Sequence, residues 1–310
     1  MQHILSSTLP IFLITLLGII IKRKWLTSEE FWRGLEKLSY FLLFPSVLFN
    51  YVSTADLSSS SLLRLVIGLI ISTIIISIIL IIYRKKVNED KIQFTSTFQG
   101  ATRYNSYIFF GLGQALFGSE GLAVVAVISS YMIIFTNILS VIIFTQYIPS
   151  NMGGRGKKAS LILLLKLLGT NPLIIASIIG FIFNYSGIKL HLGVTKAISS
   201  LSDSALAIGM LNVGAGLKFV LCPLQFKQVV FTSIIKLIVL PIITVIVLSM
   251  LSITGVAKSI GILYSCLPCA STAYVLSRQL GGDPDSMAAI ITFTTLFSVV
   301  SLSILMYILA

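Results

Sequence analysis

The sequence predicts an all-α integral membrane protein with ten transmembrane helices, arranged as two inverted five-helix repeats. Composition is the first reason, because 56% of the 310 residues are hydrophobic and only 10% are charged. Soluble domains carry about 25% charged residues, so this chain has too few polar side chains to cover a surface that faces water. Internal repetition and interrupted apolar segments are the other two reasons.

Ten apolar segments are long enough to cross a bilayer, since about 20 helical residues span about 30 Å of hydrocarbon. Sequences such as LLRLVIGLIISTIIISIILIIY do not alternate as barrel strands would. The first segment lacks a basic n-region and a cleavage site, so we expect a retained helix. The segments are 4–21, 34–53, 61–83, 92–118, 121–147, 161–184, 196–220, 228–251, 256–281 and 285–309.

The two halves of the chain resemble each other. Pro10–Gly18 reads PIFLITLLG and Pro172–Gly180 reads PLIIASIIG, with proline first, glycine last and a hydroxyl side chain at the same place. Internal duplication combined with interrupted helices is typical of secondary transporters. We predict repeats at 1–147 and 161–310, joined by a cytoplasmic linker at 148–160. Further colinear matches are Leu38–Ser39 with Leu201–Ser202, and Leu116 and Gly118 with Leu280 and Gly282.

Basic residues are distributed unevenly between the connections on the two sides of the membrane. If the N-terminus lies outside, fifteen of the 22 Lys and Arg fall in cytoplasmic connections and four in outer ones. The positive-inside rule then places both termini outside the cytoplasm, in a plasma (inner) membrane. Five helices per repeat is an odd number, so the second repeat is inverted. The net charge of +12 therefore reflects the basic residues of the cytoplasmic connections, and we expect no nucleic-acid partner.

Small and polar residues interrupt the fourth and ninth segments, at Thr102–Ser106 and Pro268–Thr272. Pro268 removes a backbone donor and clashes with the preceding turn, so its helix should break. Freed backbone groups are tolerated at membrane depth only where they line a cavity or are buried in protein. Because the N-termini of the following half-helices carry partial positive charge, we expect two broken helices that cross at an anion site.

Arg103 lies near the middle of its segment. A central arginine costs at least about 2.5 kcal/mol on insertion scales, so it needs a water-filled cavity or a partner. Two interpretations stay open: Arg103 binds the substrate, or it forms a structural ion pair with Asp203. The residues expected to bind substrate are Arg103, Tyr104, Asn105, Ser106, Pro268, Cys269, Ser271 and Thr272.

Two further ionisable residues are candidates for coupling. Asp203 could carry a proton or sodium ion, or could face the outer solvent near a helix end. Lys236 is deeper in its apolar segment than Lys166, which can extend its amine to the interface. Lys236 could pair with a substrate carboxylate or with Asp203. The CLPC sequence at Cys266–Cys269 has redox-motif spacing, but its membrane context favours small packing residues around a proline.

Four stretches resemble the auxin efflux carrier (AEC) family of permeases: RYNSYIFFGLGQALFGSEGLAVVA, LGTNPLIIASIIG, ALAIGMLNVGAGLKF and STAYVLSRQLGGDPDSMAAIIT. The resemblance implies a ten-helix fold shared with bile acid/sodium symporters, with crossed, broken helices four and nine. It also implies substrates such as malate or malonate, while plant relatives export the indole-acetate anion. Asn105 matches the family's crossover asparagine. Plant carriers have a second asparagine where this chain has Cys269 to Ser271, which does not favour auxin itself.

Together these features predict a permease that moves small carboxylate anions across the membrane by alternating access. A sodium-coupled symporter or cation/proton antiporter of the same fold stays open, with a proton or sodium as the coupling ion. A receptor that does not transport is the alternative from another class, although short loops offer it little docking surface. We find no metal-ligand cluster, phosphate loop or nucleophile elbow, so neither enzyme activity nor a cofactor is expected. A Leu- and Ile-rich outer face could support a homodimer.

Overall fold

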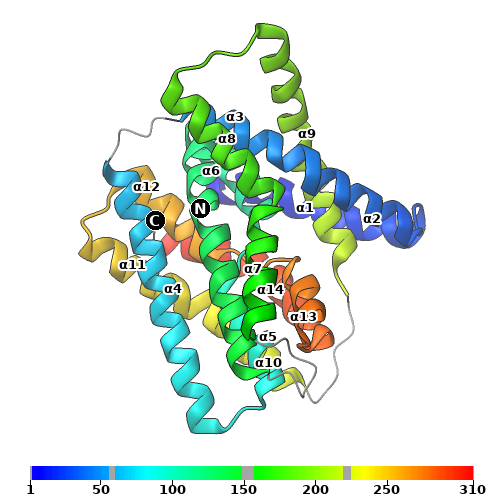
Figure 1. Ribbon diagram of the computed structural model, residues 1–310, viewed down its shortest axis with the longest axis vertical. Helices are drawn as coiled ribbons and strands as arrows, with labels where there is room; N and C mark the ends of the chain where they lie inside the picture. Colours follow the sequence, from blue (N-terminus) through cyan, green and yellow to red (C-terminus); the bar gives the residue numbers. More distant parts are fainter. Residues whose placement is uncertain (1, 56–59, 149–156, 219–224, 310) are drawn as a thin grey trace. The chain divides into compact units, whose positions relative to one another are not determined.

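The computed structural model describes residues 2–55, 60–148, 157–218 and 225–309, and these ranges contain helices but no strands (Figure 1). The predicted all-α class is therefore confirmed. The elements are α1 (Gln2–Lys24), α2 (Glu29–Leu38), the π-helical turn η1 (Ser39–Leu43), α3 (Phe44–Thr54), α4 (Ser60–Val87), α5 (Lys91–Thr102), α6 (Ser106–Tyr147), α7 (Lys157–Gly169), α8 (Pro172–Ser186), α9 (Leu192–Gly216), α10 (Phe226–Ile234), the π-helical turn η4 (Ile235–Val239), α11 (Leu240–Met250), α12 (Gly255–Cys266), α13 (Ala273–Leu280) and α14 (Pro284–Leu309).

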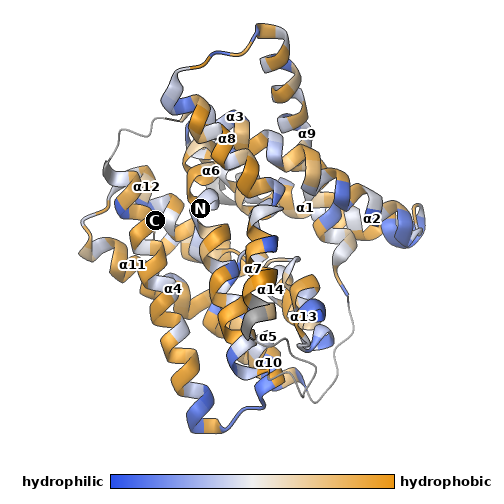
Figure 2. Ribbon diagram, viewed as in Figure 1, coloured by the Kyte–Doolittle hydropathy of each residue, from blue (hydrophilic) through white to orange (hydrophobic). Residues whose placement is uncertain are grey.

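Within the described residues, four stretches are long and apolar enough to cross a membrane: Ser61–Val87, Lys91–Tyr147, Phe226–Met250 and Pro284–Leu309. The pair Leu161–Gly169 and Pro172–Ser186 adds a fifth if it counts as one span. Figure 2 shows that hydrophobic residues dominate α4 along its length and that hydrophilic residues gather at its C-terminal end. The chain is therefore a multi-pass membrane protein, and the ten-helix inverted repeat stays a prediction.

The chain forms two compact units, each built from several segments. The first unit comprises Met1–Leu62, Ser106–Ile134 and Leu167–Gly216; the second comprises Leu63–Asn105, Phe135–Lys166 and Leu217–Ala310. Each unit draws on both halves of the sequence. Most of the predicted linker at 148–160 lies outside the described residues.

In the first unit, α1 and α9 approach each other at two glycines. A Cβ atom on Gly214 would overlap the backbone oxygen of Thr15, and one on Gly18 would overlap the backbone oxygen of Leu211. Backbone atoms cannot move aside as a flexible side chain can. Glycine is therefore required at both positions, as is common where helices pack in membranes.

The ends of α3 and α8 are joined by a side chain in the first unit. Asn184 of α8 donates through Nδ2 to the carbonyl oxygens of Val52, Ser53 and Ala55, at 3.0, 3.2 and 2.8 Å. These carbonyls belong to the last turn of α3 and to Ala55, its C-cap. A helix leaves backbone acceptors without intrahelical partners at this end. Asn184 thus terminates α3 and fixes it to α8.

Two prolines inside long helices each follow a π-helical turn. Phe44 donates its backbone N–H to Ser39 O just before Pro45, and Leu240 donates to Ile235 O just before Pro241. Proline has no N–H and clashes with the carbonyl one turn earlier. The wider π turn absorbs this misfit, so the helix continues through the proline.

The second unit packs α5 tightly against α10 and α14. A Cβ atom on Gly100 of α5 would lie 2.6 Å from Thr232 Cγ2 and 2.7 Å from Ile290 Cγ2. A Cβ atom on Gly261 of α12 would likewise lie too close to leucine side chains of α4 and α11. The Gly100 contacts lie near the C-terminal end of α5, where the helix is interrupted.

Candidate functional site

Two helix interruptions meet in the second unit. The first separates α5, which ends at Thr102, from α6, and the second separates α12 from α13. Asn105 in the first interruption donates its backbone N–H to the carbonyl oxygen of Pro268 in the second, at 2.9 Å. Both interruptions lie where the sequence predicted them.

Side chains and neighbouring backbone satisfy the groups that the second interruption frees. Pro268 has no N–H to donate, and the N–H of Cys269 finds Thr294 Oγ1 of α14 at 3.2 Å. The N–H of Leu267 donates to Tyr264 O at 3.4 Å. A non-helical stretch at membrane depth is stable only if such partners are present. Thr294 therefore supports the interruption although the sequence analysis did not single it out.

Arg103 connects the two interruptions through its side chain. Its guanidinium donates from Nη1 to Gln99 Oε1 at 3.2 Å and from Nη2 to Thr272 Oγ1 at 3.1 Å. The residue is only 7% exposed. Both of these acceptors are neutral side-chain oxygens, and together they fix the orientation of the guanidinium. The result is a guanidinium held in a fixed direction at the place where two helices are broken.

Gln99 is a site residue that the sequence analysis missed. It is fully buried in α5, one turn before Arg103, and its backbone carbonyl oxygen lies 3.8 Å from Cys269 Sγ. The detectable signal is the spacing, because residues four apart on a helix lie on one face. A glutamine one turn before a buried arginine is a candidate to orient its guanidinium.

The remaining predicted residues in these interruptions play different parts. The Nδ2 of Asn105 lies 3.5 Å from Ser271 Oγ, at the long limit for a hydrogen bond. Ser271 and Thr272 are half-buried, as is Ser106, the first residue of α6. Tyr104 is buried, and its ring lies 4.6 Å from that of Tyr264, centroid to centroid. The structure thus brings together Arg103, Asn105, Pro268, Cys269, Ser271 and Thr272.

Comparison with known proteins gives the site its context. A family described as membrane transport protein matches residues 3–306, nearly the whole chain. The chain belongs to this family. The predicted resemblance to auxin efflux carriers is therefore confirmed at the level of the family. The family is one of membrane transporters and not a class of enzymes.

Two archaeal relatives support the same assignment. An uncharacterized transporter of Methanothermobacter thermautotrophicus is 25% identical over 302 residues, covering 96% of this chain and 95% of the relative. The uncharacterized transporter MJ1031 of Methanocaldococcus jannaschii is 24% identical over 312 residues, covering 97% of each chain. Both similarities extend over nearly the whole chain, and neither relative's name gives a substrate.

In this family member, the two coupling candidates belong to different units. Lys236 lies in the π-helical turn η4 of the second unit and is fully buried. Its titratable neighbours include the thiols of Cys269 and Cys266, which are both free and buried. Asp203 lies in α9 of the first unit and is exposed. Whether either one carries a coupling ion stays a prediction.

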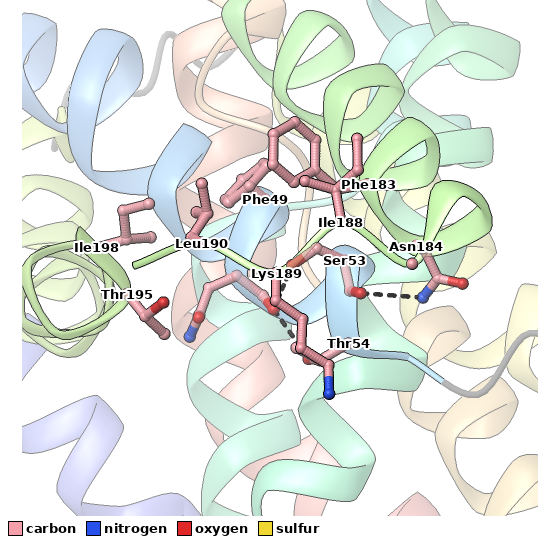
Figure 3. Close-up of a pocket in the computed structure, with 12 residues that line it drawn as sticks. Phe49, Ser53, Thr54, Phe183, Asn184, Ile188, Lys189, Leu190, Thr195 and Ile198 are labelled. Atoms are coloured by element: carbon pink, nitrogen blue, oxygen red, sulfur yellow. Dashed lines mark hydrogen bonds between the residues drawn. The ribbon is translucent and has the colours of Figure 1, made fainter. Parts of the chain in front are cut away.

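The first unit also contains a cavity of about 410 Å³. Figure 3 shows the Phe49 and Phe183 rings on one side of it and Lys189 and Thr54 on the other. Lys189 is exposed to solvent, so it attracts an anion more weakly than a buried cation does. The lining residues are Phe49, Asn50, Ser53, Thr54, Phe183, Asn184, Gly187, Ile188, Lys189, Leu190, Thr195 and Ile198, none of which was predicted to bind substrate.

Proposed function

We propose that this transporter is a secondary active carrier of small organic carboxylate anions across the plasma membrane, working by alternating access. The observation that carries the proposal is the buried guanidinium of Arg103, oriented by Gln99 and Thr272 where two helix interruptions meet. An arginine presents a rigid fork of donors that matches the two oxygens of a carboxylate. A small carboxylate is the simplest substrate that such a group recognises.

The surrounding polar groups suit the same ligand. Ser271 and Thr272 offer hydroxyl donors, and the Asn105 amide offers two N–H donors beside them. The half-helix α13 begins directly after the second interruption, and helix N-termini favour negative charge. In this proposal a carboxylate binds Arg103 and the hydroxyls, and these contacts discriminate it from neutral metabolites.

The membrane architecture forms part of the same proposal. Ten transmembrane segments in two inverted repeats, 1–147 and 161–310, place both termini outside the cytoplasm. The crossing of the fourth and ninth segments then holds the substrate near the middle of the bilayer, as in other carriers with broken helices. Malate- or malonate-sized acids fit the implied substrate class.

Cation exchange is the weaker alternative, because residues 103–105 and 267–272 contain no Asp or Glu to bind a cation. Sodium coupling of an anion carrier does not require a carboxylate, since hydroxyl and carbonyl oxygens are suitable sodium ligands. Uptake measured with and without a sodium gradient tests for this coupling.

The test is binding followed by flux. Purified protein is titrated calorimetrically with malonate, malate and acetate, and a labelled form of the best ligand is then taken up into proteoliposomes. We expect Arg103→Ala to lose binding and uptake, whereas Arg278→Ala, at an exposed arginine of α13, retains both. Full binding by Arg103→Ala, or no carboxylate bound by the wild-type protein, would overturn the proposal.

A further inference from the structure

Lys236 is a fully buried lysine near the interruptions, and none of the contacts described for the site uses its amine. Its exposure is 0%, and Nζ has no hydrogen-bond partner among the described residues. Buried lysines are rare unless the amine is paired. Inside a membrane protein an ionisable residue of this kind is a functional candidate.

The position of Lys236 relates it to both interruptions. Thr232, one turn earlier on the same helix, packs against Gly100 of α5, one turn before Arg103. Cys269, in the second interruption, has both Lys236 and Arg103 as charged neighbours, and its Sγ lies 3.8 Å from the backbone carbonyl oxygen of Gln99. π-helical turns such as η4 frequently occur at functional sites. Lys236 and Arg103 thus share Cys269 as a neighbour, and the helix that carries Lys236 packs against the end of α5 that precedes Arg103.

Among the described residues, the helices packed around η4 bring no carboxylate to Lys236. η4 packs against α5, α10, α11, α12 and α14, and its Ile235 shares a core cluster with residues of α4 and α6. The single acid on these five helices, Asp285, is exposed in the first turn of α14, where its N–H donates to Asp283. The ionisable residues of these five helices and of the second interruption are Lys91, Lys227, Lys258, Tyr264, Cys266, Cys269, Asp285 and Tyr307. The parts of α4 and α6 in this unit add Arg64, Tyr83, Arg84, Lys85, Lys86 and Tyr147, none of which is a carboxylate.

A bound anion would change the electrostatic balance at Lys236. A buried ammonium without acceptor or counter-ion is strongly disfavoured, whereas a neutral amine can be buried at much lower cost. A carboxylate held by Arg103 and the nearby hydroxyls would bring a negative charge into the same water-poor region, where charges interact strongly. Protonation of the amine and binding of the anion then favour each other.

We propose that Lys236 takes up one proton as the carboxylate binds and releases it as the carboxylate leaves, so that the carrier moves an anion together with a proton. This inference rests on the proposed function of the same site. The proton comes from bulk water and adds to the lone pair of Nζ, giving an ammonium. No bond in the substrate changes, and the transported charge is that of the anion plus one proton.

Thermodynamic linkage makes the inference measurable. If one proton binds with each anion, anion affinity falls about tenfold for each unit of pH increase, over the range in which the empty site binds no proton. Carboxylic acids of ordinary strength are fully ionised above about pH 7, so titration of the substrate does not contribute there.

The experiment counts protons with the wild-type protein. Malonate binding is measured calorimetrically from about pH 7 to about pH 9, in two buffers that differ in ionisation enthalpy. We expect about one proton taken up per malonate by the wild-type protein and by Lys258→Gln, a matched lysine on α12. We expect none for Lys236→Gln or Lys236→Met, and binding by these variants should not depend on pH.

Flux gives the second readout. In proteoliposomes an imposed pH gradient should drive malonate uptake by the wild-type protein, whereas Lys236→Gln should only exchange internal for external malonate. Binding by the wild-type protein without proton uptake, or retention of one proton by Lys236→Gln, overturns the inference and leaves the proposed function intact. Absence of malonate binding by the wild-type protein, with every other carboxylate also failing, overturns the proposed function and the inference with it.

Discussion

Arg103 and Thr272 are 169 residues apart in the sequence, and a hydrogen bond of 3.1 Å joins the Nη2 of the arginine to the hydroxyl of the threonine. The bond links one helix interruption to the other within a single compact unit. Because a hydroxyl can also donate, Thr272 can turn from accepting this bond to donating to a bound carboxylate. The pair therefore both fixes the cation and provides a group that can respond to a ligand.

Thr272→Val tests the contribution of that hydroxyl. A hydrogen bond to a charged group contributes about 1.5–3 kcal/mol, so we expect carboxylate affinity to fall by roughly tenfold to a hundredfold. Isothermal titration of malonate measures the effect. Thr254→Val is the control, since Thr254 is exposed and its side chain makes no capping hydrogen bond. Unchanged affinity in Thr272→Val would mean that the hydroxyl has no part in anion binding.

Gln99→Glu tests whether the charge of Arg103 is what the ligand recognises. The introduced carboxylate replaces a neutral acceptor that lies 3.2 Å from Nη1, so it forms an ion pair with the guanidinium and competes with the substrate. We expect folded protein with anion affinity reduced at least about tenfold, a change of about 1.4 kcal/mol. Gln93→Glu adds the same charge at an exposed position of the same helix and should bind normally. Normal binding by Gln99→Glu would place the anion elsewhere.

Part of this site could be predicted from the sequence because it depends on covalent chemistry. Pro268 cannot donate a backbone hydrogen bond in any context, and a run of small and polar residues inside an apolar segment marks the first interruption. The presence of Arg103 at membrane depth likewise required a partner or a cavity. These properties belong to single residues, so no tertiary information was needed.

The rest depends on which side chains meet. Gln99 became a site residue only because α5 turns it toward Arg103, and Thr294 only because α14 passes the second interruption. The depth of Lys236 in an apolar segment indicated that this residue was unusual. That no described residue packed around η4 carries a carboxylate near it depends on which helices meet there. Repeat boundaries and membrane orientation depend on the bilayer and stay predictions.

Gly214→Ala tests the close approach of α1 and α9. The added methyl group would overlap the backbone oxygen of Thr15, and neither backbone can yield locally. Overpacking of this kind typically costs about 1–3 kcal/mol, so we expect a clearly lower midpoint of thermal unfolding in detergent. Gly216→Ala is the matched control, because a Cβ atom there meets nothing within 4 Å. Equal unfolding midpoints for the two variants would show that α1 and α9 can move apart without loss of stability.

Glu89 precedes α5, outside the predicted transmembrane segments, and is the basis for a prediction on pH. Burial raises the pKa of its carboxyl group, although a hydrogen bond from Thr97 Oγ1 at 2.7 Å and the charge of Arg84 oppose the shift. Its second oxygen, Oε2, is buried without a partner among the described residues. Gln228 donates to the same Thr97 hydroxyl at 3.1 Å, which connects α10 to this group.

The raised pKa of Glu89 means that folded protein binds this proton more tightly than unfolded protein does. Its contribution to stability is therefore full below the ordinary glutamate pKa of about 4.3 and is lost as pH rises through the higher folded value. Glu89→Gln mimics the protonated acid, so its unfolding midpoint should decline less than that of the wild-type protein across this window. The midpoint is followed by near-ultraviolet circular dichroism at successive pH values. Glu30→Gln, at an exposed acid of α2, should show the same dependence of the unfolding midpoint on pH as the wild-type protein. If Glu89→Gln shows that dependence as well, the carboxyl group of Glu89 is ionised in the folded protein as readily as in the unfolded chain.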